Sequence, residues 1–557
     1  MPDRVSADVT IGANANIARH LALMATAQPR MAALKIPRGR TRSGDIDYLT
    51  LDFTELEAEV SAWCEKLGRA SVRQGDRTLV MVRQGLPLIA SVFAIFRLGA
   101  VPVVIDPGMG LKSFLACVHR SRARALVGIP LARILSHLFR APFSSVEVRV
   151  GASSRLTARL AARSKAPKFI LPTTNTAPTD LAAILFTSGS TGAPKGVCYE
   201  HGMFDAQIRT IRETYRIEPG EIDLPMLPIF ALFNPAMGMT TVVPEIDPRR
   251  PAAFDPARIV QAIRQENVTN SFGSPTLWGK IAAHCHTRSV TLPSLRRVLC
   301  AGAAVPATLW AQSRTLLPAG KLHSPYGATE ALPVATISSD RIDPTSVRGA
   351  CVGKPVREVE IRIIGITDAA ITRIVDAPEL SVGAIGEIVV RGPMVTKTYD
   401  AAPDATVSAK IKDTESAGVA RVWHRMGDCG YRDAEGRLWF CGRKVERVET
   451  MSGTMHTEPC EQVFRRHSRA ARCALIGLGE RGHQQPAIVV ETAVGDSNEA
   501  CDLARELRGL ATQHSHTQEI TRFYFRPRFP VDVRHNAKIH RHTLARWART
   551  AKCYECD

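Results

Sequence analysis

The stretch ILFTSGSTGAPKG, residues 184–196, decides the fold of this chain. Its apolar beginning belongs to the run Leu181–Phe186, which predicts a strand, and the strand leads into a loop with three glycines, four hydroxyls and one lysine. Glycines let backbone N–H groups turn toward an anion, hydroxyls donate further hydrogen bonds, and Lys195 adds a mobile positive charge. The stretch therefore predicts a polyphosphate-binding loop. It is not a Walker A loop, because no Ser or Thr follows the lysine.

Outward from this stretch, helix and strand patterns alternate along the chain. The run Leu86–Ile105 has the pattern of a buried helix, a turn at Gly99 and a strand that begins at Val101. Such alternation is typical of an α/β fold. The other predicted elements are the helices Leu51–Gly68 and Tyr199–Tyr215 and the strands Arg77–Val82, Ala125–Gly128 and Arg297–Cys300.

After Cys351 the pattern changes to short β-like runs separated by Gly, Pro and Asp. A further change near Gly442 predicts a domain boundary, with a large domain over residues 1–441 and a small one over residues 442–557. The small domain has its own βαβ-like pattern and ends in a basic helix. The strands predicted in this half are Glu358–Ile364, Ala384–Arg391, Leu438–Phe440, Ala474–Leu478, Ala487–Glu491 and Arg522–Phe525.

Composition narrows the function classes. Of the 557 residues, 45% are hydrophobic and 22% are charged, as in a soluble globular protein. The net charge of +19 is compatible with nucleic acid, an anionic membrane surface or acidic ligands. The charges are scattered, however, with no basic run interleaved with aromatic residues, so no nucleic-acid partner is expected. We interpret the charge as that of an ordinary arginine-rich surface; the less favoured alternative is that its field helps to attract ATP and an anionic acid.

The cysteines and the termini bear on localisation. Thirteen scattered cysteines, mostly in apolar stretches, are typical of reduced thiols in a cytoplasmic protein. Acidic residues precede any apolar run at the N-terminus, so no signal peptide is expected. Arg97, Gly99 and Pro102 interrupt the most apolar stretch, which argues against a transmembrane segment. The terminal CxxC, Cys553 to Cys556, is predicted to lie in a loose tail rather than in a metal or redox site.

Residues 184–196 resemble the signature of the adenylate-forming superfamily, which includes acyl-CoA synthetases, peptide-synthetase adenylation domains and luciferases. Further motifs follow in the family's order, from about residue 50 to about residue 545. The resemblance implies a large N-terminal domain with βαβ-rich subdomains and a small mobile α+β C-terminal domain. It also implies the ATP-dependent conversion of a carboxylate into an acyl-adenylate, with release of pyrophosphate. The residues of the first motif that it assigns to ATP binding are Thr187, Ser188, Gly189, Ser190, Thr191, Gly192 and Lys195.

The stretch SPYGATE, residues 324–330, resembles the family's second ATP motif. By this resemblance Thr329 contacts the α-phosphate and Glu330 holds Mg²⁺, for which a carboxylate is a suitable ligand. A short loop after residue 300 resembles the segment that lies against adenine, where small residues let the backbone approach a flat ring. The remaining ATP-binding residues that these two motifs imply are Gly302, Ala303, Ala304, Tyr326 and Gly327.

Two later motifs complete the resemblance. The stretch MGDCGY, residues 426–431, resembles the motif whose aspartate, here Asp428, accepts hydrogen bonds from both ribose hydroxyls. Arg443 lies where the family joins its domains and is implied to help hold the nucleotide. Lys538, in HNAKIHR (residues 535–541), occupies the position of the family's catalytic lysine, although Asn536 and Ala537 replace the usual small pair before it.

Three stretches are similar to those of the β-lactone synthetases of bacterial olefin biosynthesis. They are residues 227–251, YGATEALP at residues 326–333, and HNAKIHR. Those enzymes activate a 2-alkyl-3-hydroxy fatty acid, whose own 3-hydroxyl then displaces AMP and closes a β-lactone. The resemblance implies two neighbouring enzymes as partners, a thiolase-like enzyme upstream and a lactone decarboxylase downstream.

Alternatives remain open at this point. A long-chain acyl-CoA synthetase or a fatty acyl-AMP ligase shares every ATP residue and passes the acyl group to coenzyme A or a carrier protein. Against it, Val445 stands at the family's hinge position, and residues 451–461 depart from the stretch that helps to accept coenzyme A. A non-catalytic scaffold is disfavoured because the motif residues are intact.

The substrate side is less defined by the sequence. Methionine and phenylalanine suit flexible alkyl chains, and four such residues follow the phosphate loop; ordinary core packing is the alternative. His323 and His456 are conceivable bases for the 3-hydroxyl, but neither is assigned this role. The predicted acyl-binding residues are Phe230, Phe233, Met237 and Met239.

Overall fold

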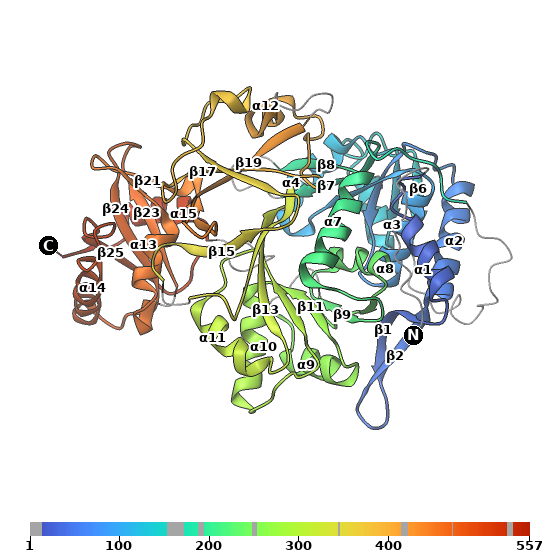
Figure 1. Ribbon diagram of the computed structural model, residues 1–557, viewed down its shortest axis with the longest axis horizontal. Coiled ribbons are helices and arrows are strands. Elements are labelled where there is room, and N and C mark those ends of the chain that lie inside the picture. The colour runs from blue at the N-terminus through green and yellow to red at the C-terminus, as the bar shows by residue number, and fades with distance from the viewer. Residues whose placement is uncertain are drawn as a thin grey trace. The chain divides into compact units, whose positions relative to one another are not determined.

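The computed structural model describes residues 14–152, 172–187, 194–247, 253–343, 346–413, 421–470, 472–531 and 539–556. The chain forms two compact units (Figure 1). The first unit comprises Met1–Pro244 with Thr396–Pro403, and the second comprises Glu245–Val395 with Asp404–Asp557. The predicted boundary at residue 442 falls inside the second unit and stays a prediction.

The first unit contains a six-stranded sheet in the order β6-β5-β3-β4-β7-β8. Its pairs are parallel except for the antiparallel pair β7–β8. The parallel strands are almost continuously apolar because both faces of such a sheet are covered. Their buried side chains include Leu79, Val103, Leu126 and Ile184. The strands are β3 (Arg77–Met81), β4 (Val101–Ile105), β5 (Ala125–Gly128), β6 (Val148–Gly151), β7 (Leu181–Thr187) and β8 (Lys195–Glu200).

Helices alternate with these strands, as the sequence predicted. The predicted helix–turn–strand is confirmed, with α3 at Leu86–Arg97 and a left-handed Gly99 before β4. The helix predicted at Tyr199–Tyr215 begins later than expected, since Tyr199 lies in β8 and pairs with Ala183 of β7. The other helices are α1 (Arg19–Ala27), α2 (Phe53–Arg69), α4 (Leu111–Ser121), α5 (Pro130–Leu138) and α7 (His201–Tyr215).

A second group of strands in the first unit has the order β9-β10-β1-β2. Its members are β1 (Ala32–Arg40), β2 (Ile46–Asp52), β9 (Ile222–Pro225) and β10 (Thr240–Val242). A 3₁₀ helix η2 (Pro228–Leu232) and the one-turn helix α8 (Asn234–Met237) connect β9 to β10. The predicted acyl-binding residues therefore lie on one short connection between neighbouring parallel strands.

The second unit is built on strands in the order β16-β17-β19-β20-β15-β14-β13-β12-β11, with β18 paired to β19. The strands are β11 (Asn270–Gly273), β12 (Arg297–Cys300), β13 (Lys321–Ala328), β14 (Ala331–Ser338), β15 (Ala350–Pro355), β16 (Glu360–Ile364), β17 (Gly386–Arg391), β18 (Lys410–Asp413), β19 (Arg421–Arg432) and β20 (Leu438–Arg443). The helices before β15 are α9 (Pro256–Gln265), α10 (Pro275–Thr287) and α11 (Ala307–Leu316), and α12 (Pro403–Ala409) precedes β18.

The residues after 443 form a separate sheet with the order β23-β24-β25-β26. Strands β24 and β25 are parallel and α14 connects them, so the predicted βαβ pattern is confirmed. The strands are β23 (Cys473–Leu478), β24 (Gln485–Glu491), β25 (Arg522–Arg526) and β26 (Tyr554–Glu555), besides the pair β21 (Val448–Glu449) and β22 (Thr454–Met455). The helices are α13 (Thr457–Phe464), α14 (Ser497–Ala511) and α15 (Arg541–Ala548).

The prediction of a loose C-terminal tail was wrong. Strand β26 pairs antiparallel with β25, and the Cys556 N–H donates to the Thr521 carbonyl at 2.9 Å. The reason is packing, since the Tyr554 ring lies 5.4 Å from that of Phe525. All thirteen cysteines are free thiols. Among the described helices, none is long and apolar enough to cross a membrane.

Candidate active site

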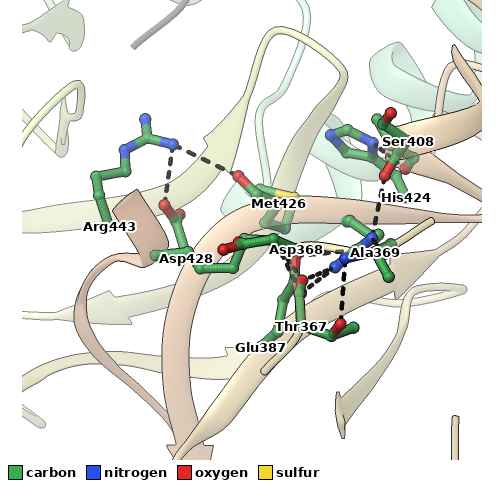
Figure 2. A network of polar contacts seen from close by, with 12 residues as sticks. Thr367, Asp368, Ala369, Glu387, Ser408, His424, Met426, Asp428 and Arg443 are labelled. Atoms are coloured by element: carbon green, nitrogen blue, oxygen red, sulfur yellow. Dashed lines mark hydrogen bonds and ion pairs between the residues drawn. The ribbon is translucent and has the colours of Figure 1, made fainter. Parts of the chain in front are cut away.

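Asp428 is the centre of a polar cluster in the second unit, made by three strands. It lies on β19 opposite Arg443 of β20, and its Oδ1 is 2.9 Å from a guanidinium nitrogen of Arg443. The Tyr326 hydroxyl, from β13, donates to Oδ2 at 2.6 Å. Burial and the Asp428 carboxylate raise the pKa of Tyr326 well above its usual value. The phenol therefore stays protonated and acts as the hydrogen-bond donor. Figure 2 shows the Arg443 guanidinium directed at Asp428 and the Met426 carbonyl.

A second polar cluster supports the first from the adjacent strand. Glu387 of β17 is in register with Cys429, the residue after Asp428, and is fully buried. Its carboxylate receives two hydrogen bonds from Arg425, at 3.0 and 2.6 Å, and Lys444 lies 3.2 Å away. Lys444 also donates to the Thr367 carbonyl at 2.9 Å. Because Arg425 precedes Asp428 on β19 and Lys444 follows Arg443, Glu387 connects the two strands that carry the Asp428–Arg443 pair.

Thr329 and Glu330 occupy the tip of a hairpin. Ala328 of β13 pairs with Ala331 of β14, so these two residues form the connecting turn. Glycine is required at position 327, because a Cβ there would clash with the Ala331 carbonyl oxygen. Both turn side chains are half-buried. The hairpin therefore presents a hydroxyl and a carboxylate side by side, as phosphate and metal binding both require.

The predicted Mg²⁺ ligand agrees with this geometry. Among the described residues, no group of three or more His, Cys, Asp or Glu side chains could hold a metal ion. Mg²⁺ in nucleotide enzymes needs only one or two carboxylates, since phosphate oxygens and water complete its octahedron. A single carboxylate at a turn therefore fits an ion that arrives with the nucleotide rather than a resident metal.

The predicted adenine loop joins β12 to α11. Gly302 has φ of +97°, a left-handed conformation that favours glycine. Gly302 and Ala304 are exposed and Ala303 is half-buried. The loop thus offers backbone and methyl groups, as expected for a surface that receives a flat ring.

The phosphate loop belongs to the first unit. Thr187 and Lys195 are paired across the antiparallel strands β7 and β8, which places them at the two ends of the loop. The Lys195 ammonium lies 5.1 Å from the centre of the Tyr399 ring, within range of a cation–π interaction. Residues 188–193, which include the predicted Ser188, Gly189, Ser190, Thr191 and Gly192, lie outside the described residues.

The predicted catalytic lysine, Lys538, also lies outside the described residues. The described chain resumes at Ile539, and Arg541 at the start of α15 forms two ion pairs. Its guanidinium is 2.7 Å from Glu461, which is fully buried, and 2.9 Å from Glu446. Since Glu446 lies three residues after Arg443, Arg541 ties the beginning of α15 to the chain that follows the Asp428 cluster.

The predicted acyl-binding residues divide into two kinds. Met237 and Met239 are buried, with 5% and 1% of their surface exposed. Phe230 and Phe233 are half-buried, and their ring centres are 6.5 Å apart. The two phenylalanines are therefore partly accessible, whereas the methionines belong to the buried interior.

Neither histidine considered as a base suits that role at neutral pH. Burial lowers the pKa of His323 to about 4 and that of His456 to about 4. Each imidazole is therefore neutral but a poor proton acceptor, since a general base works best with a pKa near the operating pH.

Sequence reasoning missed the supporting residues. The Tyr326 contact to Asp428 and the Glu387 cluster join positions 102 and 38 residues apart in the chain. No local pattern indicates such partners. The available signal was a positive charge close in sequence to each motif residue: Arg425 lies shortly before Asp428, and Lys444 follows Arg443.

With this geometry in place, comparison with known proteins identifies the class. Residues 25–400 match the family model of the AMP-binding enzymes. The chain belongs to the AMP-binding enzyme family. The matched residues include Thr329 and Glu330 and end before Asp428 and Arg443, and the roles of these four residues stay predictions.

Within this family the chain is similar over its whole length to two particular proteins. It is 43% identical over 546 residues to the olefin β-lactone synthetase of Xanthomonas campestris pv. campestris, covering 96% of this chain and 97% of that protein. It is also 43% identical over 548 residues to the olefin β-lactone synthetase of Stenotrophomonas maltophilia, covering 96% and 98%.

Solved structures agree on the fold. The o-succinylbenzoate coenzyme A synthetase of Bacillus subtilis, in complex with ATP and a magnesium ion, aligns with a TM-score of 0.71. The alignment covers 94% of this chain and 98% of that one at 21% identity. The predicted α/β adenylate-forming fold is therefore confirmed.

Proposed function

We propose that this chain activates a 2-alkyl-3-hydroxy fatty acid with ATP and closes the acyl-adenylate to a β-lactone. The observation that carries the proposal is the 43% identity, over 96% of the chain, to an olefin β-lactone synthetase. The Asp428–Arg443 ion pair supports it, because a carboxylate held at 2.9 Å by a guanidinium is suited to accept hydrogen bonds from ribose hydroxyls.

In the first step a carboxylate oxygen of the acid attacks the α-phosphorus of ATP. The bond from that phosphorus to the bridging oxygen breaks, and pyrophosphate leaves. Lys195 and the amides of its loop steady the leaving group, and Thr329 contacts the α-phosphate. Lys538 offsets the charge that develops at phosphorus. Such preorganised contacts are typically worth ~3–4 kcal/mol each.

Glu330 would hold the Mg²⁺ ion, whose chemistry when bound is to neutralise charge on the phosphate oxygens. The chain's own residues orient the nucleoside. Asp428 accepts hydrogen bonds from the ribose hydroxyls while Arg443 and Tyr326 hold its carboxylate in place. The backbone of Gly302, Ala303 and Ala304 lies against the adenine.

In the second step the 3-hydroxyl oxygen attacks the acyl carbon of the adenylate. The bond from that carbon to the phosphate oxygen breaks, AMP leaves, and the hydroxyl proton passes to a base. Both reacting groups belong to one molecule, so their effective concentration is high. Such a reaction needs no coenzyme A, in agreement with the departures at Val445 and residues 451–461.

Several features follow from the same proposal. Residues 442–557 act as a small mobile domain that brings Lys538 to the nucleotide. The free thiols support a cytoplasmic location. A thiolase-like condensation of two acyl chains must supply the substrate, and a decarboxylation of the lactone to an olefin must consume the product.

The test is one incubation of the protein with MgATP and a 2-alkyl-3-hydroxy fatty acid, without coenzyme A. We expect pyrophosphate release and a β-lactone in the NMR spectrum of the extract. Lys538→Ala should abolish both while ATP still binds, and Lys552→Ala, an exposed lysine of the same unit, should change neither. A bound adenylate that only coenzyme A discharges would replace the proposal by an acyl-CoA synthetase.

A further inference from the structure

A buried polar cluster joins the connection that carries the predicted acyl-binding residues to the two strands on either side of it. Its centre is Asp223 of β9, with 7% of its surface exposed. The side-chain amide of Asn234, the first residue of α8, donates to Asp223 Oδ2 at 2.8 Å and to the Thr241 hydroxyl at 2.9 Å. Thr241 lies on β10 in register with Asp223. We call these three residues the Asp223 cluster.

The Asp223 cluster belongs to the same connection as the predicted acyl-binding residues. The Met239 N–H donates to the Asn234 carbonyl at 3.0 Å, which closes the turn that carries Met237. Phe233, immediately before Asn234, packs with its ring centre 6.3 Å from that of Phe204. Residues nearby in the chain are apolar and buried, among them Leu224, Met226, Ala236 and Val242.

A carboxyl group in such surroundings is costly. The described residues give Asp223 a single hydrogen bond, on Oδ2, and no cation. Burial raises its pKa to about 7, against the opposing effect of the Asn234 amide. A buried carboxyl group with no cation beside it costs folding free energy, and an apolar side chain at this position would avoid the cost. Local violations of this kind are expected where a ligand completes the bonding.

The chemistry of the expected ligand is specific. An alkyl chain has nothing to offer a carboxyl oxygen, whereas an alcohol both donates and accepts a hydrogen bond. A hydroxylated acid that lies along Phe230 and Phe233 would bring its hydroxyl group toward the Asp223 cluster. Among the described side chains of this connection, the polar one is that of Asn234, which belongs to that cluster.

We propose that Asp223 is a specificity-determining residue that hydrogen-bonds the 3-hydroxyl group of the acid substrate, with Asn234 holding its carboxyl in position. This inference rests on the proposed function and deepens it. Asp223 and Asn234 thereby select hydroxylated acids over plain fatty acids before the acid is activated.

The experiment compares two acids that differ only in the hydroxyl. With enzyme in excess, the first-turnover rate of pyrophosphate release is measured for a 2-alkyl-3-hydroxy fatty acid and for the 2-alkyl fatty acid without the hydroxyl. Excess enzyme matters because the second acid cannot close a lactone. The wild-type protein should prefer the hydroxylated acid by roughly 10- to 150-fold, the value of a hydrogen bond to a charged group.

Asp223→Leu should remove most of this preference by slowing the hydroxylated acid alone. Asp223→Asn, which is isosteric and retains a carbonyl acceptor, should remove less of it and guards against a folding defect in the leucine variant. Asp205→Asn is the matched control and should leave the preference unchanged, since Asp205 of α7 pairs with Arg19 and His20 of α1.

The outcomes separate the two proposals. An unchanged preference in both folded Asp223 variants would overturn the inference and leave the proposed function intact. No pyrophosphate from either acid with the wild-type protein would overturn both. Loss of activity toward both acids in Asp223→Asn would show that Asp223 has a structural role, and it would also overturn the inference.

Discussion

The two buried acids Glu387 and Asp223 solve the same electrostatic problem in opposite ways. Glu387 in the second unit has Arg425 and Lys444 at its carboxylate, whereas Asp223 in the first unit has one amide. The ion pairs of Glu387 hold together the strands that carry Asp428. Asp223 has no cation beside it, so its carboxyl group keeps its capacity to bind a ligand. The comparison teaches that pairing, rather than burial alone, separates a supporting acid from a recognition acid.

The strongest way to break this comparison is to remove Glu387. Glu387→Ala leaves the buried Arg425 guanidinium without its carboxylate partner, which costs ~3–5 kcal/mol of the free energy of unfolding. The measurement is the midpoint of urea unfolding followed by tryptophan fluorescence, since Trp423 and Trp439 lie on β19 and β20. A shift no larger than that of a surface pair would show that Glu387 does not support these strands.

The next effect concerns the nucleotide. Asp428→Asn keeps the shape but removes the charge that Arg443 and the ribose hydroxyls share, so binding should weaken by ~1.5–3 kcal/mol, or roughly 10- to 150-fold. Isothermal titration with ATP measures it. Tyr326→Phe is the matched variant and should lose only ~0.5–1.5 kcal/mol, because one neutral donor is removed. Equal losses would contradict the assignment of Asp428 to the ribose.

A smaller effect is the pH dependence of the contribution that Asp223 makes to the free energy of unfolding. The pKa of Asp223 is about 7 in the folded protein and near 3.8 when unfolded, so the folded state binds more protons between these values. Its contribution to stability is therefore lost as pH rises from about 4 to about 7. Asp223→Asn should gain stability relative to wild type between pH 5 and pH 8, on the order of 1 kcal/mol. Urea midpoints of both proteins at the two pH values test this, and a pH-independent difference would contradict it.

The smallest expected effect is that of removing an exposed carboxylate, which serves as a control for Glu387→Ala. Glu360 pairs with Arg391 at the surface, with 55% of its side chain exposed. Glu360→Ala should change the unfolding midpoint by only ~0–1 kcal/mol, because solvent screens an exposed pair. A larger loss would show that the second unit responds to any removed carboxylate, and the Glu387 result would then lose its meaning.

Much of the fold was predictable because its signals are local. Strands β4, β5 and β12 have the bounds that were expected, since each is a short apolar run bounded by turn residues. Strand β8 was missed, because its pairing with β7 depends on the partner strand and not on its own pattern. The terminal strand β26 was mistaken for a tail for the same reason, as two residues carry no periodicity.

In the candidate site, too, residues with a local sequence signal could be predicted and those that depend on distant partners could not. Asp428 and Arg443 could be singled out because they stand in short local motifs, and the structure brings them together across β19 and β20. Glu387 and Asp223 could not, because what distinguishes them is the set of groups around each carboxyl. That set comes from strands far apart in the chain, so only the folded structure reveals it.

The distribution of sulfur has a practical consequence. Nine of the thirteen free thiols are buried, and burial raises the pKa of Cys64 and Cys429 to about 12, so they are inert while the protein is folded. Unfolding exposes these thiols to solvent, where dissolved oxygen oxidises pairs of thiolates to disulfides that hinder refolding. Heat inactivation in air should therefore be a one-way process whose half-life reports the unfolding rate, and a reductant should restore part of the reversibility.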